Sequence, residues 1–159
     1  MRAAVIGALA AVVVALGLVA GLHTRWLADE QAAAAEREAV MRAAGAHAVN
    51  LLSVSHDSVE EDIRRVLNSS TGPARDAYEA GVTKLRQTTV ADKVVQIGVL
   101  RSVGLVSLSG DEARALVVAD GVIQWEGREA APRERFHRWT MDLTKTGGSW
   151  LVSRWEEVP

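Results

Sequence analysis

The chain has 159 residues, a formal net charge of −2 and no cysteine. This length suits one domain with a hydrophobic core. The small net charge gives no sign of a nucleic-acid partner, and the lack of cysteine excludes disulfides, cysteine-ligated zinc and a thiol nucleophile.

The first predicted element is an uncharged, apolar segment at residues 3–22. At about 1.5 Å per residue, a helix of this length spans about 30 Å, the thickness of the hydrocarbon core of a bilayer. A signal peptide usually has a shorter apolar core, although the sequence VAG at 19–21 resembles a weak cleavage site. A soluble core helix is disfavoured because the segment is apolar on every face. We expect residues 1–25 to form an uncleaved, single-pass membrane anchor with short flanks.

The orientation of this anchor is weakly encoded. Arg2 lies on one flank, and His23 and Arg25 lie on the other, so the positive-inside rule decides little. A lone N-terminal anchor before a large C-terminal domain commonly has its N-terminus in the cytoplasm. We therefore expect a cell-membrane protein with a cytoplasmic N-terminus and an extracytoplasmic C-terminal domain.

Residues 26–39 are rich in Ala, Glu and Arg, which are strong helix formers. Trp26 suits the membrane interface, where an amphipathic ring is favoured. These residues are predicted to form a helical stalk, and residues 40–159 the extracytoplasmic domain.

The domain opens with an apolar stripe at helical spacing. Its members are Val40, Ala44, His47, Leu51 and Val54. For His47 we favour a buried side chain bonded to a neighbour over a ligand or a base.

The stretch at residues 51–72, LLSVSHDSVEEDIRRVLNSSTG, has the residue types of an active site. Ser58 and Glu61 fit a capping box, as do Asp57 and Glu60 one residue earlier, and the acidic residues suit a helix N-terminus. Helix punctuation accounts for every polar residue here except His56, so we predict a joint between helices and no catalytic site.

A short helix and a further helix after it are predicted here. The first buries Val59, Ile63, Val66 and Leu67, and residues 68–72 end it. Pro73 suits the start of the second helix. The buried face of the second helix comprises Ala74, Tyr78, Val82 and Leu85.

Strands follow, because β-branched residues and alternation replace the helical period after Asp92. Gly98 and Gly104 suit bends or bulges in the first strand, and Asp120-Gly121 suits a bulge or break in the second. The predicted strands are 93–108, 112–125, 135–146 and 150–158, and His137, Trp139, Met141 and Leu143 point to one side of the third. Three helices followed by four antiparallel strands predict an α+β fold, with the helices on one face of a curved sheet.

Several segments together carry a resemblance to a known family. They are Leu51–Asp62, Thr71-Gly72, Val103–Leu108 and the GSWLV sequence at 148–152. With the anchor and stalk, this layout resembles the Mce-associated membrane proteins of actinobacteria. The resemblance implies a VirB8-like domain, an NTF2-like cone of three helices on a four-stranded sheet. It also implies support of Mce complexes, in which a permease and substrate-binding proteins move lipids or sterols, and it brings no catalytic residue.

We therefore expect a non-catalytic accessory or scaffold subunit of an Mce-type transport complex, with the Mce proteins and the bilayer as partners. One alternative is a VirB8-like component of a secretion or conjugation channel. A second is an NTF2-like ligand binder or enzyme, for which His137 or Tyr78 would be the candidate base. No catalytic residue, cofactor-binding residue or metal ligand is predicted.

The candidate partner interface consists of a tryptophan and three arginines. Trp is enriched at interfaces, and most of the tryptophans are expected in the core of a domain with one Phe. Trp155 is expected to be the more exposed one. The candidate interface residues are Trp155, Arg133, Arg135 and Arg138.

Overall fold

The computed structural model describes residues 28–158. The described residues divide into two units between Glu36 and Arg37. The predicted anchor and Trp26 lie outside the described residues, and residues 28–39 of the predicted stalk are helical. Within residues 28–158, no helix has the length and apolar character needed to span a bilayer.

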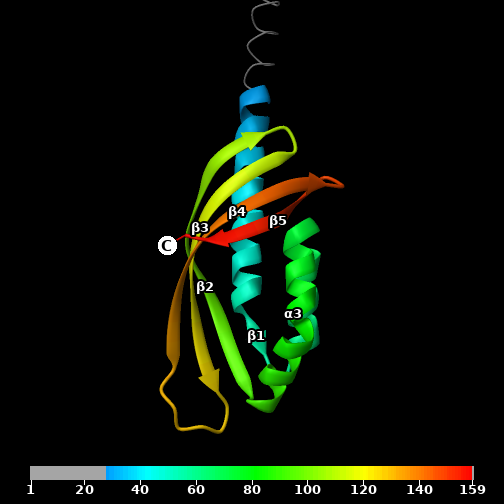
Figure 1. Ribbon diagram of the computed structural model, residues 1–159. Helices are drawn as coiled ribbons and strands as arrows, with labels where there is room; N and C mark the ends of the chain where they lie inside the picture. The colour runs from blue at the N-terminus through cyan, green and yellow to red at the C-terminus, as the bar shows by residue number, and fades with distance from the viewer. Residues whose placement is uncertain (1–27, 159) are drawn as a thin grey trace, which may run out of the picture. The chain divides into compact units, whose positions relative to one another are not determined.

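The second unit contains one antiparallel sheet in the order β1-β2-β3-β4-β5 (Figure 1). The strands are β1 (Val54–Ser55), β2 (Val94–Ser109), β3 (Glu112–Trp125), β4 (Arg133–Thr146) and β5 (Ser149–Glu157). Strands β2 to β5 agree with the four predicted ones to within two residues. The two-residue β1 was not predicted, and Val54, which we assigned to a helix, pairs with Gln96 instead. A strand of two residues is too short to show an alternating pattern of apolar and polar side chains.

Three helical segments accompany the sheet. They are residues 37–52, α2 (Val59–Asn68) and α3 (Gly72–Ala91). The stripe on the first helix is buried at Val40, Ala44 and His47, and this helix shares one core with β3, β4 and β5. Three of the four core residues of β3 are alanines, which let the helix approach the sheet closely. The predicted α+β architecture, with helices packed on one face of a curved sheet, is confirmed.

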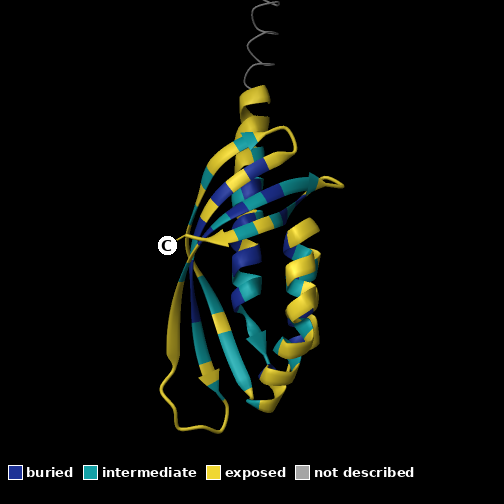
Figure 2. Ribbon diagram, in the orientation of Figure 1, coloured by how far each residue is buried: buried dark blue, intermediate teal, exposed yellow. Residues whose placement is uncertain are grey.

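Alternation along the strands separates the helix-covered face of the sheet from the other, which we call the open face. On β4, Trp139, Met141 and Leu143 are buried against the helices, as predicted. The residues between them therefore point to the open face. Figure 2 shows the same alternation as bands of buried and exposed residues along the strands.

The glycines of β2 have a different role from the predicted one. The irregularities of β2 fall between Leu100 and Ser102 and between Leu105 and Ser107, not at Gly98 or Gly104. The β2 strand passes the end of the first helix at Gly98, where an added Cβ would lie 2.7 Å from Leu52 Cβ. β3 also continues without a break through its Asp-Gly pair, because Gly121 pairs with Gly98.

The connection between α2 and α3 covers part of the outer edge of β5. The Thr71 amide donates to the carbonyl of Val152 at 2.9 Å, and the Val152 amide donates to the carbonyl of Ser69 at 3.0 Å. Ser70 thereby forms an isolated parallel bridge with Val152.

Candidate functional site

The joint between β1 and α2 is organised by one buried carboxylate, Asp62, which is 3% exposed. One of its oxygens accepts hydrogen bonds from the Ser55 amide at 2.8 Å and from the Ser58 hydroxyl at 2.9 Å, and Arg65 donates to the other. The predicted capping box is wrong, because Ser58 makes no side-chain cap hydrogen bond at the start of α2. Its hydroxyl reaches the carboxylate four residues later, so the joint is structural.

Replacing Asp62 by Asn should destabilise the domain by about 1–2 kcal/mol, because the NH2 group of the amide is itself a donor and cannot accept from one of these donors. Urea unfolding followed by circular dichroism measures the loss. Glu61→Gln is the matched control, since Glu61 is exposed and meets Arg65 only at 3.3 Å, and it should change stability by less than about 0.5 kcal/mol. Equal effects of the two variants would contradict the structural role of Asp62.

His47 is completely buried and lies beside Ser69 of the α2–α3 connection. Its Nδ1 lies 2.8 Å from the Ser69 hydroxyl oxygen, and that hydroxyl donates to the carbonyls of Arg65 and Val66. Because two carbonyl oxygens are in reach of the single proton of the Ser69 hydroxyl, we infer that His47 donates to Ser69 from Nδ1. A serine that accepts from histidine is not activated as a nucleophile.

The other nitrogen of His47, Nε2, has no hydrogen-bond partner within the described part of the chain. The ring lies 5.7 Å from that of Trp155, measured between centroids. Burial lowers the pKa of His47 to about 4, so the ring is neutral at physiological pH. The expected role, a buried histidine bonded to a neighbour, fits this geometry at one of the two ring nitrogens.

The remaining candidate bases are also engaged with neighbours. His56 bridges Glu126, at 2.7 Å from Nε2, and Asp57, at 3.1 Å from Nδ1. His137 stacks on Trp139, with its Nδ1 3.4 Å from a Glu157 oxygen.

Tyr78 on α3 is unsuited to act as a base near neutral pH. Burial, followed by the negative charge of Asp62, raises the pKa of its hydroxyl to about 12. The sequence had placed Tyr78 on the inner face of its helix, and the residue is half-buried there.

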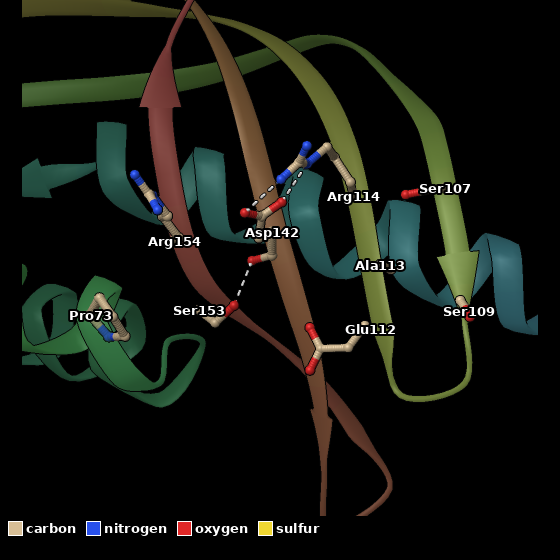
Figure 3. A pocket seen from close by; sticks show the side chains of 9 residues that line it. All are labelled: Pro73, Ser107, Ser109, Glu112, Ala113, Arg114, Asp142, Ser153 and Arg154. Atoms are coloured by element: carbon tan, nitrogen blue, oxygen red, sulfur yellow. Dashed lines mark hydrogen bonds and ion pairs between the residues drawn. The ribbon is translucent and has the colours of Figure 1, made fainter.

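A depression of about 410 Å³ surrounds Asp142 on the open face (Figure 3). Arg114 donates to both oxygens of Asp142, at 2.6 and 3.1 Å, and these hydrogen bonds raise the pKa of the guanidinium. The lining is Pro73, Ser107, Ser109, Glu112, Ala113, Arg114, Asp142, Ser153 and Arg154. Two arginines and two carboxylates give it no net charge, and its described lining holds no histidine, tyrosine or cysteine. It is a polar surface feature without a nucleophile and base in hydrogen-bond reach.

The predicted interface residues do not form one patch. Trp155 is half-buried and packs against the core next to His47. Arg133 and Arg135 are exposed on one side of β4, where the Arg133 guanidinium lies 5.4 Å from the ring centroid of Trp125. Arg138 is exposed on the open face. A strand alternates its side chains with period two, so residues close in sequence are divided between two faces.

The apolar character of the open face was not predicted from the sequence. Phe136 is 71% exposed, Ile97 is 54% exposed and Leu116 is 48% exposed. The position of Phe136 in the sequence could have indicated its exposure. Phe136 and Arg138 are two residues apart on β4, so they share the face of the sheet opposite the core residues. Large apolar side chains exposed on one face of a sheet are candidates for an interaction site.

Comparison with known proteins identifies sequence relatives. The family described as "Uncharacterized protein Rv1363c/MT1408-like" matches residues 3–159. The protein described as "Uncharacterized protein Rv1363c" of Mycobacterium tuberculosis is 29% identical over 164 residues, which cover 99% of this chain and 61% of that protein. The chain thus spans about three fifths of the length of this curated relative.

Solved structures share the fold at low identity. An IcmL-like type IV secretion system protein from Legionella pneumophila has a TM-score of 0.64 at 11% identity, covering 77% of this chain and 92% of that one. VirB8 of Agrobacterium tumefaciens has a TM-score of 0.60 at 13% identity, covering 78% and 94%. A putative aromatic ring hydroxylase from Novosphingobium aromaticivorans has a TM-score of 0.54 at 16% identity, covering 77% and 90%. At these identities the likeness shows a VirB8-like, NTF2-like fold and nothing more.

Proposed function

This chain belongs to the Rv1363c/MT1408-like family, and from its fold and surfaces we propose that it is a non-catalytic assembly subunit of a multiprotein complex in the cell envelope. In this role the domain binds partner proteins and holds them in position within the complex. The observation that carries this proposal is the exposed apolar open face of a domain whose fold is similar to that of VirB8. Such a face is suited to protein contacts.

The packing of the domain favours a scaffold over an enzyme. Large side chains pack in the core between helices and sheet, among them Trp139, Met141, Leu143 and Trp150. His47, His56 and His137 each contact a neighbour of this chain. A ligand-holding cone would instead keep a cavity with a few convergent polar groups.

Two complexes are candidates for the assembly. Structural likeness to VirB8 and to an IcmL-like protein supports a component of a secretion or conjugation channel, and this is the partner class that the comparisons favour. The resemblance of the sequence to Mce-associated proteins supports an Mce-type lipid or sterol transporter instead. In both cases we place the domain outside the cytoplasmic membrane, held by an anchor formed by residues 1–25.

Capture of the full chain from native membranes tests the proposal. A C-terminally tagged chain is solubilised gently, and the proteins that co-purify are identified by mass spectrometry. Enrichment of secretion-channel ATPases and pore proteins supports the channel, and enrichment of an Mce permease with its substrate-binding proteins supports the transporter. An unrelated single-pass membrane protein with the same tag is the control. Recovery of neither set above that control would contradict an assembly role.

A further inference from the structure

The open face carries an apolar patch that crosses three strands. β2 contributes Ile97 and Val99, β3 contributes Leu116, Val118 and Val122, and β4 contributes Phe136. Val122 pairs with Ile97, whereas Asp120 lies between Val99 and Phe136 and pairs with both. Leu116 lies further along β3, where it pairs with Gly104 and Thr140. Directly paired residues of antiparallel strands share one face of a sheet. Phe136, the most exposed large apolar side chain described, lies at the β4 border of this patch.

Two opposite charges flank Phe136 on the same face. Glu134 precedes it by two residues and Arg138 follows it by two, so all three side chains point outward together. Within the described residues, neither the Glu134 nor the Arg138 side chain forms an ion pair or a hydrogen bond. This differs from the other charges of the open face.

Other opposite charges of the open face meet within the chain, and one of these pairs includes Asp120, which lies directly beside Phe136 in the sheet. Arg101 lies 2.5 Å from Asp120, Arg114 binds Asp142, and Arg154 binds Glu156. Glu112, another carboxylate of this face, accepts a hydrogen bond from the Thr144 hydroxyl. Glu134 and Arg138 are thus left without an ion pair or hydrogen bond in the described part of the chain, and they lie two residues before and two residues after Phe136. A partner of a single charge sign would satisfy only one of them.

We propose that a second copy of this chain packs on the patch, open face to open face, around a two-fold axis at Phe136. The two β4 strands then run antiparallel, and Glu134 of each copy faces Arg138 of the other. The two phenylalanine rings meet at the centre of the contact. A two-fold interface joins a surface to itself, so it requires this reciprocal arrangement of charge. Aromatic side chains at the centre and paired charges around them are typical of stable interfaces.

Edge-to-edge pairing is blocked at the Arg138 end of this segment. The Val158 amide donates to the carbonyl of Arg138 at 2.8 Å, so Val158 already occupies the position beside Arg138 at the border of the sheet. This inference does not depend on which complex the chain assembles with.

Charge exchange in the full chain tests the proposal. Analytical ultracentrifugation in mild detergent should show a dimer of the natural sequence. Glu134→Arg alone and Arg138→Glu alone should each weaken dimerisation at least about tenfold, because like charges then face each other. The double variant Glu134→Arg/Arg138→Glu should recover dimerisation to within about threefold of the natural chain. That recovery separates the interface from a folding defect.

Two further variants sharpen the result. Glu129→Arg makes the same charge change in the exposed loop before β4, and it should leave dimerisation unchanged. Because the chain has no cysteine, Phe136→Cys introduces a single thiol, and oxidation should link two copies through it. A natural chain that stays monomeric would overturn the proposal and leave the patch to a different protein. Single variants that still dimerise, or a double variant that does not recover, would overturn it equally.

Discussion

Acidification from about pH 6.5 to about pH 4 should destabilise this domain by about 3 kcal/mol through His47 alone. The pKa of His47 is lowered from 6.5 to about 4 because the ring is buried, and one pKa unit corresponds to about 1.4 kcal/mol. Between these pH values the unfolded chain binds a proton that the folded chain does not, so the free energy of unfolding falls as pH falls. The full stability is present above pH 6.5, and the loss is complete below pH 4.

Urea unfolding at pH 7 and at pH 4.5 measures this effect. His47→Asn is the informative variant, because its amide can still donate to Ser69 and cannot be protonated. The variant should be less stable than the natural chain at pH 7 because it leaves a cavity. It should also lose less stability on acidification, since the remaining pH dependence comes from other groups. An unchanged pH dependence in His47→Asn would show that this histidine does not link folding to pH.

Introducing Val at Gly98 should destabilise the domain by about 3 kcal/mol. The new Cβ would lie 2.7 Å from Leu52 Cβ and 2.8 Å from the carbonyl oxygen of Val49, both on the first helix. One of these contacts is to backbone, so the helix and the sheet must separate to admit the side chain. Loss of helix–sheet packing then adds to the strain.

Gly104 provides the matched control on the same strand. An added Cβ at Gly104 meets no atom within 4 Å, and Val is favoured in strands. Gly104→Val should therefore leave stability unchanged or raise it slightly, while Gly98→Val lowers the urea midpoint. Equal losses in the two variants would indicate a general need for glycine in β2 and not close packing at Gly98.

The order of helices and strands could be predicted because each long element carries its own periodicity. Alternation along β4 also located the core residues Trp139, Met141 and Leu143 correctly. Local sequence patterns could not predict β1, because its two residues are held by pairing with β2. They also misassigned Ser58, because a capping template is satisfied by sequence spacing whether or not the hydroxyl finds another acceptor.

The features that matter most for function arise between distant segments. The partner of His47 is Ser69, 22 residues away, and the restriction at Gly98 comes from a helix more than forty residues earlier. The candidate interface was grouped by closeness in sequence, whereas a strand divides such a group between two faces. Phe136 was overlooked because its neighbours on the open face belong to other strands.

The outer strands of the sheet limit how copies of the chain can associate with one another. An outer strand with free backbone groups can recruit another strand without limit, which leads to fibres. The α2–α3 connection occupies the edge of β5 at Val152, and two bulges distort β2 on the opposite side. Both devices oppose open-ended growth. Copies of this domain should therefore resist polymerisation by strand addition at these two borders.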